Sequence, residues 1–191
     1  MKDASQTRSV DELTQALQAG AKAKYVLFWG HTGKPGHDVG PWVFSQWFHA
    51  PFEHEGCSYP TAEHWMMAGK ARLFDDDKAL AAILAASSPA EAKHLGRTVR
   101  RFDEATWVAK RFELVVEGNV LKFSSSETLR KYLLGTKNRV LVEASPADRI
   151  WGVGFAADHA NATRPDQWRG LNLLGFALMQ ARARLLDAGA Q

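Results

Sequence analysis

The sequence predicts a predominantly α-helical α+β fold, a single domain that carries a small β-sheet. Segments with a helical spacing of apolar residues cover most of the chain, whereas only short segments have the composition of strands. No internal repeat, low-complexity block or interdomain linker interrupts this pattern. At 191 residues, the chain has the length of one domain with a sizeable core.

Strands are expected in two places. Residues 24–29 gather aromatic and branched side chains, and residues 139–143 read Arg-Val-Leu-Val-Glu. A glycine-rich loop, residues 30–40, follows the first strand, and a turn-rich, hairpin-like piece is expected at residues 53–59. The β-structure is therefore a minor part of the fold.

Helices are expected over most of the remaining chain. Thr61 is a good N-cap after Pro60, so one helix begins there, and Gly135 ends another. The longest helix carries an apolar stripe along one side. The expected helices are residues 10–17, 61–73, 76–86, 89–95, 104–123, 127–134 and 171–186.

The composition excludes several classes of protein. The 24 basic and 21 acidic residues give a net charge of +3, and the basic residues form no nucleic-acid-binding arm. No run of about 18 apolar residues exists, so no membrane association is expected. Residues 1–14 lack the apolar middle of a signal peptide, which favours a cytoplasmic location. Cys57 is the only cysteine, which excludes a disulfide within the chain and a cysteine-based zinc site.

The sequence predicts neither a metal site nor a cofactor. Gly30-His-Thr-Gly-Lys34 resembles a P-loop, but its spacing is short and Pro35 stands where Ser or Thr would hold magnesium. Residues 152–157 match a dinucleotide-binding pattern, yet they follow a turn rather than a buried strand. The seven histidines include no pair with the i, i+4 spacing of a helical zinc site.

Residues 60–70 are the most informative stretch of the chain. Glu63 and Lys70 are seven positions apart, nearly two helical turns, so both point along one face about 10 Å from each other. A carboxylate and an amine beside Met66 and Met67 fit the wall of an active site. The alternative is an ordinary amphipathic helix with solvated charges.

A second group of polar and aromatic residues lies in the glycine-bounded turn at residues 145–154. Asp148 stands three residues before Trp151, so the turn can hold the carboxylate rigidly while the ring offers a stacking face. The alternative is a helix-capping aspartate beside a core tryptophan. Asn172, at the start of the last helix, is placed either to bond a ligand hydroxyl or to cap the backbone.

Several segments share their residues and their order with a known family: Phe28-Trp-Gly30, Phe44-Ser-Gln-Trp-Phe48, Tyr59-Pro-Thr-Ala-Glu-His-Trp65 through Lys70, Leu95-Gly-Arg97, Trp107, Leu121-Lys-Phe123, Ser145-Pro-Ala-Asp-Arg-Ile-Trp-Gly152 and Asn172-Leu-Leu-Gly-Phe-Ala-Leu-Met179. Together they resemble the NADAR superfamily, of YbiA-like N-glycosidase type. We therefore expect a YbiA-like domain at residues 25–188, preceded by an extension with a short helix at residues 1–24. Met67 and Gly69 stand where YbiA-like helices often carry glutamines.

The resemblance implies an enzyme, a hydrolase that cleaves the N-glycosidic bond between ribose and a base or amine. One branch of the family hydrolyses early intermediates of riboflavin synthesis and releases ribose 5-phosphate from the pyrimidine. Another branch removes ADP-ribose from guanine in nucleic acid. We therefore expect a small phosphorylated ribosyl substrate, with ADP-ribosylated nucleic acid as the alternative partner. A third alternative is a non-catalytic module that binds ADP-ribose or a nucleotide.

The matching positions also imply roles. Glu63, Asp148, Trp107 and Trp151 would form the functional core, and Lys70 matches the lysine that ends the helix motif. Breaking the C1′–N bond builds positive charge on the ribose, which Glu63 would stabilise while it orders or deprotonates water. Asp148 would hold ribose hydroxyls or serve as the second acid/base group. The two tryptophans would stack on the base or exclude water.

Two roles fit Lys70: it binds phosphate as a point charge, or its amine attacks an opened ribose to form a Schiff base. The loop at residues 30–40, with Lys34, is expected to close over phosphate. The nucleic-acid alternative needs a basic groove, for which the candidates are Arg97, Arg100 and Arg101. The further expected substrate-binding residues are Trp29, Gly30, Ser45, Gln46, Trp47, Gly152 and Asn172.

Overall fold

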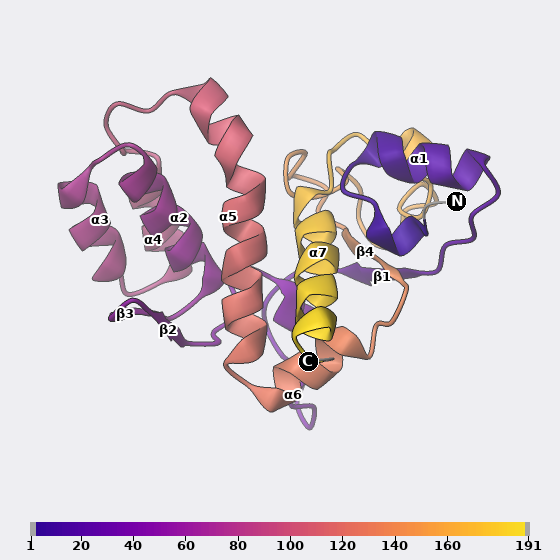
Figure 1. The fold of residues 1–191 in the computed structure, drawn as a ribbon, viewed down its shortest axis with the longest axis horizontal. Helices are drawn as coiled ribbons and strands as arrows, with labels where there is room; N and C mark the ends of the chain where they lie inside the picture. Colours follow the sequence, from indigo (N-terminus) through magenta and orange to yellow (C-terminus); the bar gives the residue numbers. More distant parts are fainter. Residues whose placement is uncertain (1–2, 190–191) are drawn as a thin grey trace.

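The computed structural model describes residues 3–189 and confirms the predicted fold class, a mainly helical α+β domain (Figure 1). The helices in this range are α1 (Val10–Gln18), α2 (Ala62–Leu73), α3 (Asp77–Leu84), α4 (Pro89–Gly96), α5 (Glu104–Ser124), α6 (Glu127–Leu134) and α7 (Leu173–Ala188). The strands are β1 (Tyr25–Phe28), β2 (Phe52–His54), β3 (Cys57–Tyr59) and β4 (Val140–Glu143).

Side-chain caps start several helices where the sequence predicted them. Thr61 accepts a hydrogen bond from the main-chain N–H of His64, and Ser88 and Asp103 cap α4 and α5 in the same way. Each cap satisfies an N–H group of the first turn that has no partner inside the helix. Because these bonds are local, the predicted boundaries agree with the structure to within two residues.

The molecule has two halves on either side of a central helix pair, α5 and α7, which pack against each other (Figure 1). Helices α2, α3 and α4 and the β2–β3 hairpin lie on the α5 side. The β1–β4 pair and α1 lie on the α7 side. The central pair therefore joins the two halves.

The predicted small sheet is two separate two-stranded pairs within the described residues. β2 and β3 form the expected antiparallel hairpin, whereas β1 and β4 are parallel, with Phe28 opposite Glu143. Residues 140–142 are fully buried, as expected for a parallel strand that is covered on both faces. The carboxyl ends of β1 and β4 lie side by side, which is where α/β sheets commonly bind ligands.

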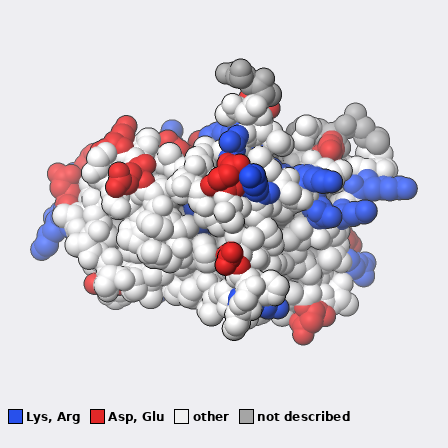
Figure 2. Space-filling view, turned by 90° about the horizontal axis from the view of Figure 1, so that it is seen from below, with Lys and Arg blue, Asp and Glu red and all other residues white. Residues whose placement is uncertain are grey.

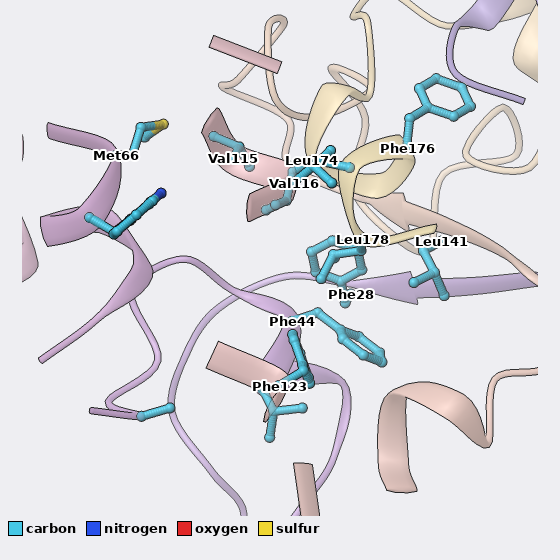
Figure 3. Close-up of a cluster of buried hydrophobic side chains, with 14 of the residues drawn as sticks. Phe28, Phe44, Met66, Val115, Val116, Phe123, Leu141, Leu174, Phe176 and Leu178 are labelled. Atoms are coloured by element: carbon cyan, nitrogen blue, oxygen red, sulfur yellow. The ribbon is translucent and has the colours of Figure 1, made fainter. Parts of the chain in front are cut away.

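The buried side chain of Lys122 holds the short 3₁₀ turn at residues 41–44 in place. Phe28, Phe44 and Phe123 meet in the core, with ring centroids of the Phe28–Phe44 pair 5.5 Å apart (Figure 3). Beside them, the fully buried Lys122 donates from Nζ to the carbonyl oxygens of Val43 and Ser45, at 2.7 and 2.8 Å. Burial lowers the pKa of Lys122 to about 7. These bonds attach the short 3₁₀ turn at residues 41–44 to α5.

The surface carries both signs of charge. On the face shown in Figure 2, basic side chains gather toward the right and acidic side chains lie mostly toward the left and the centre. The small net charge of +3 therefore hides a local separation of charge. Among residues 3–189, no helix combines the length and the apolar character that crossing a bilayer requires.

Candidate active site

A cavity of about 330 Å³ lies where the two halves of the molecule meet. Helices α2 and α4 form one side, and the end of β4, the turn that follows it and α7 form the other. A second hollow of about 440 Å³ adjoins it and shares part of its wall. The residues that line the cavity are Ser45, Gln46, Trp47, Glu63, Met66, Met67, Lys70, Lys93, Gly96, Arg97, Trp107, Glu143, Asp148, Ile150, Trp151 and Leu174.

The structure brings most of the sequence-predicted site residues together. Trp29 and Gly30 line the adjoining hollow, whereas Gly152 and Asn172 pack behind the wall of the cavity. Those that line the cavity itself are Ser45, Gln46, Trp47, Glu63, Lys70, Trp107, Asp148 and Trp151. Side chains from positions 63, 148 and 151 therefore converge on one ligand-sized space.

Glu63 is held in the first turn of α2 with its carboxyl in the cavity wall. Its main-chain N–H donates to the carbonyl of Gln46 at 3.0 Å, and its side chain is only 3% exposed. One carboxyl oxygen, Oε1, is buried without a hydrogen-bond partner among the residues that the structure describes. Burial raises the pKa of Glu63 to about 7, an effect that Asp148 adds to and that Lys93, Trp47 and Arg97 partly offset. Glu63 is thus poised between its two protonation states near neutral pH.

Lys70 lies two turns along α2 on the same face. Its Nζ donates to the carbonyl of Gly96 at 2.8 Å and lies 4.1 Å from the centroid of the Phe102 ring and 5.7 Å from that of Trp107. Burial lowers the pKa of this amine. Partial burial thus disfavours the charge on this amine, while the Gly96 carbonyl and the faces of Phe102 and Trp107 stabilise its ammonium form.

Asp148 is fixed by the turn that follows β4. Its Oδ1 accepts hydrogen bonds from the main-chain N–H groups of Ile150, at 2.8 Å, and Trp151, at 2.7 Å. Ser145 completes the turn by accepting from the Asp148 N–H at 3.2 Å. Of the two arrangements left open by the sequence, the structure has the turn that holds the carboxylate close to Trp151, in the form of an Asx turn. The same bonds fix the main chain of Trp151, whose side chain lines the cavity.

Asn172 and Gly152 shape the wall from behind. The fully buried Asn172 donates to the carbonyl of Leu141 and accepts from the N–H of Glu143, both at 2.9 Å. Asn172 adopts a left-handed backbone with φ of 50°, so α7 begins only at Leu173. A Cβ on Gly152 would lie 2.9 Å from the Glu143 carbonyl oxygen. Asn172 therefore holds the end of β4 in place through bonds from its side chain to main chain, and Gly152 lets the next segment pass close to it.

Glu143 and Lys93 are the polar cavity residues that sequence reasoning missed. Glu143 ends β4, and its Oε2 is buried with no hydrogen-bond partner within residues 3–189. Burial raises the pKa of Glu143 to about 8, with Asp148 and Glu63 adding to the rise and Lys93 opposing it. Lys93, on α4, lies 5.8 Å from the centroid of the Trp47 ring. The position of Glu143 at the carboxyl end of an expected strand was the signal available in the sequence.

The arginines proposed for a nucleic-acid groove divide into two groups. Arg97 lines the cavity. Arg100 instead forms three hydrogen bonds with Asp76, and Arg101 donates to the main-chain carbonyl of Asp75. The basic side chains at the cavity are therefore Lys70, Lys93 and Arg97.

Buried carboxyl groups, basic side chains and tryptophans surround one cavity in this fold. This combination is typical of the active site of an enzyme that acts on a small ligand. The chain matches the NADAR domain family over residues 27–186 and belongs to that family. This match confirms the resemblance that the sequence motifs indicated.

Named relatives agree with this assignment. An N-glycosidase of Acanthamoeba polyphaga mimivirus is 43% identical over 164 residues, which cover 83% of this chain and 95% of the relative. The solution NMR structure of Escherichia coli YbiA covers 89% of both chains with a TM-score of 0.69 and 26% sequence identity. The chloroplastic riboflavin biosynthesis protein PYRR of Zea mays is 35% identical over 136 residues, 68% of this chain and 20% of that protein. The expected enzyme class, a hydrolase of N-glycosyl bonds, is consistent with the N-glycosidase name of the viral relative.

Proposed function

We propose that this protein is an N-glycosidase that hydrolyses the bond between C1′ of a ribose 5-phosphate and the nitrogen of an amino-pyrimidine, an early intermediate of riboflavin biosynthesis. The observation that carries the proposal is Glu63, a carboxyl buried in the wall of a ligand-sized cavity with one oxygen unpaired in the described chain. The name of the viral relative supports the class of bond. The match to the maize riboflavin biosynthesis protein supports the substrate.

Glu63 would act at C1′. When the C1′–N bond breaks, both bonding electrons leave with the nitrogen, and C1′ shares a positive charge with the ring oxygen. An ionised Glu63 stabilises that charge strongly because its surroundings exclude water. A carboxyl with a pKa of about 7 is also well matched to accept the proton of the attacking water near neutral pH.

Asp148 would orient the ribose. Two main-chain N–H groups occupy its Oδ1, which leaves Oδ2 to accept hydrogen bonds from ribose hydroxyls. Because one turn fixes both Asp148 and Trp151, the sugar and the stacked base would be oriented together. Trp47 and Trp107 extend the aromatic part of the same wall.

Basic side chains would receive the 5′-phosphate. Lys93 and Arg97 line the cavity and provide positive charge close to the carboxyl groups. Lys70 keeps the two roles given above, phosphate binding or Schiff-base formation, and burial lowers the pKa of its amine, the direction that Schiff-base formation requires. Borohydride reduction during turnover, followed by mass spectrometry, distinguishes them because only a Schiff base leaves ribose phosphate attached to Lys70.

A product assay tests the proposed function. The protein is incubated separately with a phosphoribosylamino-pyrimidine and with ADP-ribosylated guanosine, and released ribose 5-phosphate or ADP-ribose is measured by mass spectrometry. The proposal expects ribose 5-phosphate from the pyrimidine. Binding of either compound without any product would instead identify a non-catalytic binding module.

One observation favours ADP-ribosyl hydrolysis as the second candidate function. The adjoining hollow shares Ser45, Trp47, Lys93, Glu143 and Asp148 with the cavity, so a ligand longer than one phosphoribosyl group has room to continue into it. Trp29, which is 65% exposed, lines this hollow and offers a face for a second base. Release of ADP-ribose from guanosine in the same assay would select this candidate.

A further inference from the structure

Glu143 is a buried carboxyl at the cavity to which neither the family motifs nor the roles above assign a function. It ends β4, and its main chain is anchored on both sides: the N–H donates to Asn172, and the carbonyl accepts from the N–H groups of Ser145 and Val153. Its side chain lines both the cavity and the adjoining hollow. The carboxyl is thus held at a fixed point of the ligand space.

The groups around Glu143 make it unfavourable for all the carboxyl groups of the cavity to be ionised at the same time. Glu63 approaches from α2 and Asp148 from the turn after β4, while Lys93 on α4 supplies positive charge. Asp148 accepts two main-chain N–H bonds through Oδ1, which hold its carboxyl group in place. Glu63 and Glu143 each keep one buried oxygen without a partner in the described part of the chain. Carboxyl groups that share a site in this way retain protons.

We propose that Glu143 is the proton donor of the reaction, an inference that rests on the proposed N-glycosidase function. Its carboxyl proton passes to the departing nitrogen as the C1′–N bond breaks and the bonding electrons move to that nitrogen. Water then attacks C1′ and gives its proton to Glu63. Transfer of that proton to Glu143 through solvent restores both groups, so the net reaction consumes one water and releases the sugar and the free amine.

The neighbours of the two glutamates decide which one donates a proton and which one accepts a proton. Lys93, Arg97 and Trp47 act on Glu63 and favour its ionised form, whereas Lys93 alone opposes the two carboxylates that act on Glu143. Burial raises the pKa of both groups, and more nearby positive charge and hydrogen bonding offset the rise at Glu63 than at Glu143. Two carboxyl groups whose environments separate their pKa values are the usual arrangement for an acid and a base in one site.

The test is the pH dependence of kcat/KM for the wild-type protein and for Glu143→Gln, with whichever substrate of the product assay the wild-type protein cleaves. Glutamine keeps the size of the side chain but has no acidic proton. We expect kcat/KM to fall about 10²- to 10⁴-fold, with the loss in kcat rather than KM. The wild-type profile should fall above a pH of about 8, and this alkaline limb should be absent in the variant. The matched control is Glu117→Gln, a change at an exposed position of α5 that should behave like the wild type.

The outcomes separate this inference from the function on which it rests. If the wild-type protein releases no product, the proposed function is wrong and the role of Glu143 falls with it. If the wild-type protein is active and Glu143→Gln retains that activity or its alkaline limb, only the role of Glu143 is wrong. If Glu143→Gln does not fold, the wild-type profile decides, because activity that persists undiminished above pH 9 contradicts a donor of this pKa.

Discussion

Two acidic side chains of this protein, Glu63 and Asp76, are almost equally buried and have opposite chemistry. Glu63 is 3% exposed and Asp76 is 2% exposed. Asp76 caps α3 through the N–H of Ala79 and accepts three further bonds from Arg100, which hold the pKa of Asp76 well below its usual range. Glu63 keeps an oxygen without a partner within residues 3–189, and its pKa rises to about 7.

This difference teaches that burial alone does not mark a functional charged group. Lys122 is fully buried, and it donates to two carbonyl groups of the core. Arg182, also buried, donates to Thr136 and to the carbonyl of Arg139. These groups resemble Asp76, since each has protein partners. By contrast, Glu63 and Glu143 line the cavity, and each has one carboxyl oxygen without a hydrogen-bond partner in the described part of the chain. A missing partner on a group that lines a cavity is therefore the useful sign of a ligand site, since Arg111 and Arg130 also have a buried nitrogen without a partner in the described chain but lie outside this cavity.

The largest expected effect is on catalysis at Glu63. Glu63→Gln removes the negative charge next to C1′ and the acceptor for the water proton, so kcat/KM should fall by about 10³-fold or more. The measurement is ribose 5-phosphate release with the folded variant, and Glu117→Gln is again the control. A variant that retains full turnover would show that Glu63 is not catalytic.

Asp76→Asn should lower the stability of the protein and leave catalysis unchanged. Losing the charge weakens the bonds that Asp76 accepts from Arg100, so the melting temperature should fall below that of the wild type. The kcat/KM should be unchanged at temperatures where the variant is folded, because Asp76 lies outside the cavity lining. Loss of activity without loss of stability would contradict the contrast between the two carboxyl groups.

The smallest expected effect is on the pH dependence of stability. The folded pKa of Glu63 is above the ordinary value of 4.5, so the folded protein keeps a proton that the unfolded chain loses between pH 4.5 and about 7. The free energy of unfolding should therefore decrease as pH rises through this window, by on the order of 1 to 3 kcal/mol.

Two variants separate the contributions of Glu63 and Asp76 to the pH dependence of stability. Glu63→Gln should be more stable than the wild type at pH 8 and no more stable at pH 4, measured by urea unfolding. Asp76 has a depressed pKa, so its contribution is present above the ordinary value of 3.8 and is lost as pH falls below it. Asp76→Asn should accordingly reduce the loss of stability in acid. Equal pH profiles for Glu63→Gln and the wild type would contradict the raised pKa.

The sequence predicted the features that depend on neighbours along the chain. The Thr61 N-cap sets the start of α2, and helical spacing placed Glu63 and Lys70 on one face. The pairing of Asp148 with Trp151 is also local, because one turn holds both. These parts of the fold and of the candidate site could therefore be foreseen.

Features that depend on distant segments could not be predicted in the same way. Glu143 reaches the cavity because β4 pairs in parallel with β1 and because Asn172, far along the chain, accepts from its N–H. Lys93 reaches it because α4 packs against α2. Asn172 itself was expected near a ligand, but its left-handed backbone turns its amide toward β4. Tertiary packing decided each of these positions.

The pKa values of Glu63 and Asp76 can be measured directly by ¹³C NMR titration of the side-chain carboxyl carbons in a protein labelled at glutamate and aspartate. Spectra of Glu63→Gln and Asp76→Asn assign the two resonances. We expect Glu63 to titrate with a midpoint near pH 7, while Asp76 stays ionised to the lowest pH at which the protein remains folded. A Glu63 midpoint near the ordinary value of 4.5 would contradict the central claim.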